Sequence, residues 1–224
     1  ASVYLAEERD IEDAVLSSQR AFEITKKAPA YKRADILNNI VRGLEKRKEE
    51  FAKTITFEAG KPISDSRAEV SRAINTFQIA SEEAKRIEGE VIPLDLMQGS
   101  ENRFGIIRRF PIGPVLGITP FNFPLNLVAH KVAPAIASGN TIILKPAPKT
   151  PVTALMLGEL ISDTGLPAGG LNIVPCSILL AEKLVTDRRI KKLSFTGSAA
   201  VGLKLKTMAG MKKVTLELGG NAAV

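Results

Sequence analysis

The sequence predicts an α/β fold in which a doubly wound, Rossmann-like parallel sheet follows a set of N-terminal helices. Two observations carry this prediction. From about residue 115 onward, short strand-like runs alternate with helical patterns, whereas the chain before Gly89 shows helical patterns. The run Thr141–Leu144 is also continuously apolar, which is typical of a parallel strand buried on both faces.

The N-terminal region predicts three helices. Asp10 is a plausible N-cap for the first, because its carboxylate can accept a backbone N–H of the opening turn. The second is expected over Tyr31–Ala59 as one continuous helix. The third is expected to begin at a capping box formed by Ser66 and Glu69, and to turn Ile87 inward near its end.

The region after Gly89 predicts the strands. Arg103–Arg109 and Val115–Thr119 are expected to pair across the turn Pro111–Pro114 as a projecting hairpin. Helices are then expected near 127–138, 152–164, 178–185 and 199–209, and further strands near 141–144, 171–174, 193–195 and 214–218.

Composition excludes several classes of protein. The net charge is +7, but the basic pairs are scattered, and with no Trp and two Tyr there is no basic, aromatic stripe, so no nucleic-acid partner is expected. The single cysteine excludes an internal disulfide and fits a reducing compartment. The uncharged run Pro111–Ala129 contains Pro114, Pro120 and Pro124, which argue against a membrane helix. We therefore expect a cytoplasmic protein that does not bind a membrane.

Ligands gather at the carboxyl ends of strands in an open parallel sheet, so a site is expected at the turns that follow them. The turn Thr119–Pro124 holds Asn122 between two prolines, which fix the backbone on either side. An amide held in this way can donate to a developing oxyanion and lower the barrier by about 3 kcal/mol. The same residues also fit an ordinary turn in which asparagine caps local backbone, and the segment alone leaves both interpretations open.

Two later turns contain groups that can bind an anion. Lys145 follows the apolar strand and can bond ribose hydroxyls or a phosphate, or it can be a solvated lysine of a proline-rich loop. Gly197 allows backbone to approach an anion closely, and Ser198 with the following helix N-terminus supplies donors for a pyrophosphate. The usual G-x-G-x-x-G pattern is absent, so this turn alone does not identify a dinucleotide site.

The last turn places a carboxylate before two glycines. Glu217 ends the final predicted strand and is followed by Leu218, Gly219 and Gly220. A carboxylate on such a flexible segment suits a general base that moves or loses solvent. The alternative is a glutamate placed simply where the chain leaves the core.

Four segments together resemble the aldehyde dehydrogenase family in order and spacing: Pro-Phe-Asn-Phe-Pro (120–124), Lys-Pro-Ala-Pro-Lys-Thr-Pro (145–151), Phe-Thr-Gly-Ser (195–198) and Leu-Glu-Leu-Gly-Gly (216–220). The resemblance extends over nearly all of the chain. It implies an oxidoreductase in which a cysteine thiolate attacks an aldehyde, hydride passes to NAD or NADP, and water releases the acid from a thioester. By this resemblance, residues 1–224 form the NAD(P)-binding domain of such an enzyme.

The resemblance also implies catalytic roles for three residues. Asn122 matches the amide that holds the oxyanion, and Glu217 matches the base that activates water. Lys131 matches a lysine near the catalytic funnel, with a role in proton relay. No metal site is expected.

Cofactor contacts are implied in the same way. Lys145 matches the lysine that contacts the adenosine ribose, and Pro148 stands where many NAD-preferring relatives carry a glutamate. Without that carboxylate, and with the added charge of Lys149, we expect tolerance of NADP. The other expected cofactor contacts are Thr119, Pro120, Phe121, Gly197, Ser198, Gly202 and Leu218.

The nucleophile of the family lies beyond the position of Glu217, past the end of this sequence. Cys176 is the only thiol, and it matches a loop near the cofactor, so we expect a small residue after a strand and not a nucleophile. His130 is expected to pack or to form hydrogen bonds and not to act as a general base. This chain is therefore expected to be an N-terminal portion without the catalytic domain, and to be inactive alone.

Partners and substrate are implied less directly. By the resemblance, the hairpin at about 99–119 is an oligomerisation arm, so a homo-oligomer is expected. The segment Pro120–Pro134 is similar to relatives that act on lactaldehyde or glyceraldehyde-type substrates. One alternative is a CoA-acylating semialdehyde dehydrogenase, against which the water-activating Glu217 argues. Another is a non-catalytic binding or structural protein that retains the fold.

Overall fold

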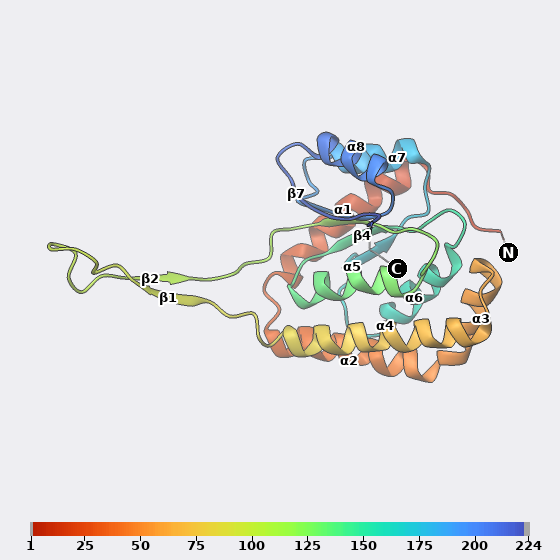
Figure 1. Ribbon diagram of the computed structural model, residues 1–224, viewed down its shortest axis with the longest axis horizontal. Coiled ribbons are helices and arrows are strands. Elements are labelled where there is room, and N and C mark those ends of the chain that lie inside the picture. Colours follow the sequence, from red (N-terminus) through yellow and green to blue (C-terminus); the bar gives the residue numbers. More distant parts are fainter. Residues whose placement is uncertain (1, 222–224) are drawn as a thin grey trace.

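The computed structural model describes residues 2–221, which form an α/β body with a long two-stranded arm (Figure 1). The body contains a five-stranded sheet in the order β5-β4-β3-β6-β7, and every neighbouring pair is parallel. Its strands are β3 (Val115–Ile118), β4 (Ile142–Lys145), β5 (Leu171–Ile173), β6 (Lys192–Thr196) and β7 (Lys213–Glu217). The chain runs outward from β3 to β5 and then returns to β6 on the other side of β3, which confirms the doubly wound sheet.

Eight helices occur within the described residues. They are α1 (Glu8–Thr25), α2 (Ala30–Lys46), α3 (Lys48–Ala59), α4 (Ile63–Glu83), α5 (Asn126–Ala137), α6 (Val152–Ser162), α7 (Ile178–Thr186) and α8 (Ala199–Ala209). None of them is both long and apolar enough to span a membrane.

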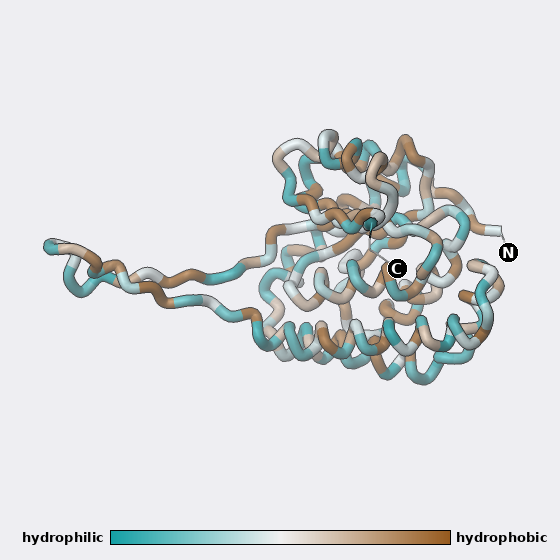
Figure 2. The backbone as a smooth tube through the Cα atoms, in the orientation of Figure 1, coloured by the Kyte–Doolittle hydropathy of each residue, from teal (hydrophilic) through white to brown (hydrophobic). Residues whose placement is uncertain are grey.

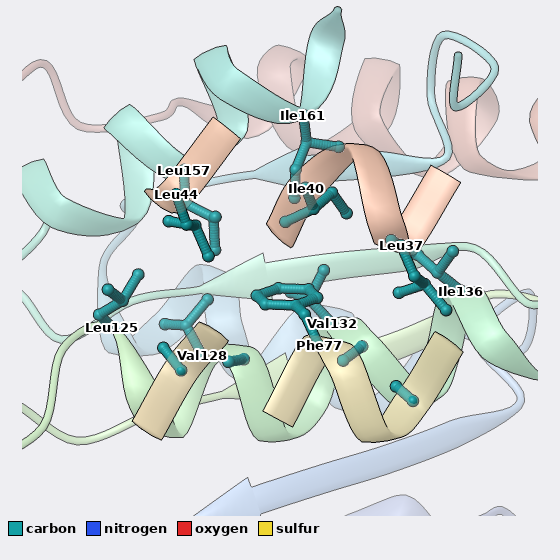
Figure 3. Close-up of a cluster of buried hydrophobic side chains, with 14 of the residues drawn as sticks. Leu37, Ile40, Leu44, Phe77, Leu125, Val128, Val132, Ile136, Leu157 and Ile161 are labelled. Carbon is teal, nitrogen blue, oxygen red and sulfur yellow. The ribbon is translucent and has the colours of Figure 1, made fainter. Parts of the chain in front are cut away.

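Two hydrophobic clusters lie on the two faces of the sheet. Successive side chains of a strand point to opposite faces, and Ile142 and Leu144 accordingly join one cluster while Ile143 joins the other. The first cluster packs α2 to α6 on one face, and Figure 3 shows Phe77 of α4 at its centre. The second packs α1, α7 and α8 on the opposite face. Burial on both faces explains why β4 is a continuous apolar run.

The prediction that Arg103–Arg109 and Val115–Thr119 pair as a hairpin is wrong. The arm pairs β1 (Glu90–Pro93) with β2 (Phe104–Ile107) in antiparallel register, and Val115–Ile118 is instead the fully buried central strand of the sheet. The segment before β3 does not form a hairpin turn, because the backbone N–H groups of Ile112 and Gly113 donate to Asn140 Oδ1 at 2.8 and 3.0 Å. That contact directs the chain into the sheet. Figure 2 shows hydrophobic stretches along the projecting arm.

Three expectations about helix ends are also corrected. The N-cap of α1 is Glu7, with Asp10 as its reciprocal partner three residues into the helix. The helix expected over Tyr31–Ala59 is broken at Arg47, whose φ of −104° and ψ of 17° separate α2 from α3. Each of these two helices packs separately on α4.

The third correction concerns α4, which begins at Ile63, so Ser66 and Glu69 lie inside it and form no capping box. Ser66 Oγ instead accepts a hydrogen bond from Thr56 at 2.9 Å. Ile87 lies beyond the end of α4 and is 41% exposed, so it is not an inward-facing residue.

Candidate active site

The turns after β3, β4, β6 and β7 meet at the carboxyl edge of the sheet, since all these strands are parallel. Two cavities open there. The first, which we call the Asn122 cavity, has a volume of about 660 Å³. Its lining residues are Arg72, Pro120, Phe121, Asn122, Phe123, Asn126, Leu127, His130, Thr196, Gly197, Glu217, Leu218 and Gly219.

The Asn122 cavity joins residues from three strand ends. Asn122 comes from the turn after β3, Gly197 from the turn after β6, and Glu217 from the end of β7. The structure therefore places the predicted amide and the predicted carboxylate in the same cavity, together with Pro120, Phe121 and Leu218. His130 is exposed and also lines this cavity, so it is not a buried packing residue. No cluster of acidic, histidine and cysteine side chains suited to a metal occurs within residues 2–221.

A hydrogen-bonded chain links Lys131 to Glu217 beside this cavity. Lys131 is buried on α5, and its Nζ donates to Thr196 Oγ1 at 2.8 Å and contacts Ser194 Oγ at 3.4 Å. Thr196 Oγ1 in turn donates to Glu217 Oε2 at 3.3 Å. Burial lowers the pKa of Lys131 to about 8, although the nearby Glu217 carboxylate opposes this effect. The lysine can therefore hold or release a proton near neutral pH, and Thr196, which was not predicted as a site residue, connects it to the carboxylate.

The lowered pKa of Lys131 predicts a pH-dependent stability. The folded pKa is about 8 and the ordinary value is 10.5, so between these values the unfolded chain binds more protons than the folded one. The free energy of unfolding should then rise with pH through this window, by up to about 3 kcal/mol from this residue. Below about pH 8 the penalty for burying the charge is fully present.

The measurement is urea unfolding of the wild type and of Lys131→Met from about pH 7.5 to about pH 10. Subtracting the variant removes the contributions of the other titrating groups. The wild type should gain stability relative to the variant as the pH rises. A difference that stays constant across the series would rule out the lowered pKa.

The second cavity, which we call the Pro148 cavity, has a volume of about 570 Å³ and opens beside the end of β4. Its lining residues are Val3, Leu5, Thr54, Phe57, Glu58, Pro146, Pro148, Lys149, Pro151, Val152, Pro175 and Cys176. Lys149 lines this cavity, and its Nζ lies 5.3 Å from the centre of the ring of Phe121, which lines the Asn122 cavity. Glu58 was not predicted, and it gives this cavity a carboxylate even though Pro148 supplies none.

Cys176 lines the Pro148 cavity, whereas Lys145, at the end of β4, is among the lining residues of neither cavity. Both are buried, and Lys145 Nζ donates to the Pro146 carbonyl at 3.1 Å. Burial lowers the pKa of Lys145, with Cys176 opposing, and burial raises the pKa of the Cys176 thiol. A buried thiol with a raised pKa is poorly ionised at neutral pH, so Cys176 lacks the properties of a nucleophile.

The remaining predicted residues line neither cavity. Thr119 is buried, and its N–H donates to the Lys145 carbonyl at 3.2 Å, which joins the ends of β3 and β4. Ser198 precedes α8, but its side chain makes no capping hydrogen bond. A Cβ at Gly202 would lie 2.5 Å from Leu218 Cδ2, so the absence of a side chain at Gly202 lets Leu218 pack closely against α8.

Comparison with known proteins places this site in a family. Residues 1–224 match the model described as "Aldehyde dehydrogenase family". The chain is 43% identical over its whole length to the 3-sulfolactaldehyde dehydrogenase of Priestia megaterium, of which it covers 46%. It is 40% identical to the lactaldehyde dehydrogenase of Methanocaldococcus jannaschii, over 94% of this chain and 45% of that protein. The chain thus spans about half the length of the curated relatives it matches.

Solved structures agree. Aldehyde dehydrogenase 21 from Physcomitrella patens, in complex with the reaction product succinate, matches 99% of this chain and 46% of its own, with a TM-score of 0.96 and 49% identity. The glyceraldehyde-3-phosphate dehydrogenase GapN from Methanocaldococcus jannaschii, complexed with NADP, matches 98% of this chain and 48% of its own, with a TM-score of 0.91 and 38% identity. The chain belongs to the aldehyde dehydrogenase family.

Proposed function

We propose that this sequence forms the cofactor-binding part of an NAD(P)-dependent aldehyde dehydrogenase, which oxidises an aldehyde to a carboxylic acid through a cysteine thioester. The observation that carries the proposal is the meeting of Asn122 and Glu217 in one cavity at the carboxyl edge of the sheet. The NADP complex of the related GapN supports the cofactor class.

The proposed roles follow from the chemistry of each group. The Asn122 side-chain amide donates a hydrogen bond to the oxyanion that forms at the aldehyde carbon. Glu217 accepts a proton from the water that releases the acid. Glu217 then gives this proton to Thr196 Oγ1, and Thr196 passes its own hydroxyl proton to the neutral amine of Lys131, since Thr196 Oγ1 contacts both groups.

The cofactor, which accepts the hydride, would lie along the strand ends from β4 to β6. Lys145 offers an ammonium group with one protein acceptor, and the N-terminus of α8 offers backbone donors that Ser198 does not cap. Pro148 presents no carboxylate to repel a 2′-phosphate, whereas Glu58 lines the same cavity. Glu58 Oε2 already accepts hydrogen bonds from the Thr153 N–H at 2.8 Å and the Thr153 hydroxyl at 3.1 Å, so we propose that both NAD and NADP are accepted.

We propose that the substrate is a small aldehyde with an anionic group. Arg72 lines the Asn122 cavity and is exposed, and its guanidinium lies 5.2 Å from the centre of the Phe123 ring. No ion pair of Arg72 occurs among the described residues, so its charge is available to a ligand. Relatives named for 3-sulfolactaldehyde, aspartate semialdehyde and succinate semialdehyde act on aldehydes that carry such a group.

The arm supports a homo-oligomer. Val91, Phe104 and Ile106 on its two strands are each more than 60% exposed, and both outer edges of the two-stranded ribbon are unpaired in the described chain. Exposed apolar side chains and free strand edges favour pairing with another chain. We propose that the arm formed by β1 and β2 makes the contact between subunits.

The experiment is a test of the 224-residue chain with NAD+ and NADP+. Both should bind weakly and shift the backbone NMR signals of Gly197, Ser198 and Lys145, because these groups line the proposed path. No aldehyde-dependent NAD(P)H should appear, because the only thiol, Cys176, is buried and poorly ionised. Signals that stay unmoved at millimolar cofactor would reject the binding site, and NAD(P)H formation by this chain would reject the assignment of Cys176.

A further inference from the structure

The N-terminus of α5, directly after the Pro120–Pro124 turn, is capped by a side chain from another helix. Glu69 of α4 is fully buried, and its Oε1 accepts the backbone N–H groups of Leu125 at 2.9 Å and Asn126 at 3.1 Å. No carbonyl within α5 can reach these two amides, because they lie in its opening turn. The carboxylate also lies at the positive end of the helix dipole, a position that stabilises the helix.

The second carboxylate oxygen of Glu69 acts through Lys61 on Phe123, the residue that follows Asn122. Glu69 Oε2 accepts a hydrogen bond from Lys61 Nζ at 2.7 Å, and that Nζ lies 3.8 Å from the centre of the Phe123 ring. Arg72, one turn after Glu69 on α4, lies over the same ring. Attraction between these cations and the ring holds Phe123 in place, and Glu69 orders one of the two.

The side chain of Asn122 is not fixed by hydrogen bonds of its own among the described residues. Among residues 2–221 its side chain makes no hydrogen bond with the protein, and the residue is exposed to the Asn122 cavity. The place of its amide therefore depends on the backbone on either side. On the far side that backbone runs through Phe123 into the opening turn of α5, where Glu69 binds.

We propose that Glu69 is a positioning residue, which holds the Asn122 amide in the Asn122 cavity by capping α5 and by ordering Lys61 over Phe123. The catalytic meaning of this role rests on the proposed function, because it assumes that the Asn122 amide binds the oxyanion. The positioning itself is a property of the 224-residue chain without cofactor or aldehyde.

Three variants of the isotope-labelled chain test this. Glu69→Ala removes both hydrogen bonds and the partner of Lys61, whereas Glu69→Gln keeps a carbonyl oxygen that can accept both N–H groups. Glu58→Ala is the matched control, because Glu58 caps α6 in the same manner by accepting Thr153 N–H at 2.8 Å. Amide hydrogen exchange and the side-chain NH₂ signals of Asn122 are measured by NMR.

Glu69→Ala should speed exchange at Leu125 and Asn126 roughly tenfold to a hundredfold and should shift or broaden the Asn122 NH₂ signals. Glu69→Gln should keep both close to the wild type. Glu58→Ala should speed exchange at Thr153 and leave the Asn122 signals in place.

Unchanged exchange at Leu125 and Asn126 in Glu69→Ala would overturn the proposal. The proposal would also fail if Leu125 and Asn126 exchanged as fast in Glu69→Gln as in Glu69→Ala. It would fail as well if Glu58→Ala shifted the Asn122 NH₂ signals as much as Glu69→Ala does, since Glu69 would then support only the general stability of the chain. None of these measurements needs a cofactor, so a failure of the proposed function and a failure of this proposal are distinguishable.

Discussion

Truncating Phe77 to alanine should lower the free energy of unfolding by about 3 to 5 kcal/mol. Phe77 is fully buried at the centre of the first hydrophobic cluster, with Leu37, Ile40 and Val132 among the labelled side chains around it (Figure 3). Its removal leaves a cavity between α2, α4 and α5, which can close only partly because three packed helices hold its walls. The measurement is the urea unfolding midpoint at constant slope.

Phe57→Ala is the matched control for this variant. Phe57 lies on α3 in the same helical region, but it is 87% exposed, so its truncation removes little buried surface. A change of no more than about 0.5 kcal/mol is expected. Equal losses in the two variants would contradict the packing assigned to Phe77.

Replacing Lys145 by methionine should weaken cofactor binding about tenfold to a hundredfold, because a charge-assisted hydrogen bond to the cofactor is lost. The same change should raise the stability of the protein without cofactor at neutral pH. Burial lowers the pKa of Lys145, which means that the folded state disfavours its charge, and methionine fills a similar volume without one. A residue that is unfavourable for folding but needed for binding is typical of a functional site.

Cofactor affinity is followed by NMR titration and stability by urea unfolding of the same samples. Lys32→Met serves as the control, because Lys32 is an exposed lysine on α2 outside both cavities. It should change neither quantity. If Lys145→Met bound the cofactor as tightly as the wild type, the assignment of Lys145 to the cofactor site would be wrong.

Much of the fold was predictable from local pattern. Strands β4 to β7 and helices α5 to α8 lie within a few residues of their predicted places, because the period of apolar residues reports which face of an element is buried. The pattern did not distinguish a hairpin strand from a central strand. Val115–Ile118 is apolar in either case, and its pairing with β4 and β6 depends on segments far along the chain.

The helix ends were less predictable for a related reason. Ser66 and Glu69 have the spacing of a capping box, yet both lie inside α4 and not at its first turn boundary, because the helix begins at Ile63. Glu69 instead caps α5, which follows α4 in the chain only after the arm and β3. A capping box is recognised from the spacing of residues within one segment. A buried carboxylate instead accepts hydrogen bonds from whichever unpaired backbone N–H groups the fold places next to it.

The sequence by itself determined the order of the elements and the four turns that carry Asn122, Lys145, Gly197 and Glu217. Each of these depends on neighbouring residues alone, and so does the resemblance to the family. The tertiary structure decided which side chains share a cavity. Arg72 and Glu58 entered the two cavities, and Thr196 joined Lys131 to Glu217, only because parallel strands from distant parts of the chain end at one edge of the sheet.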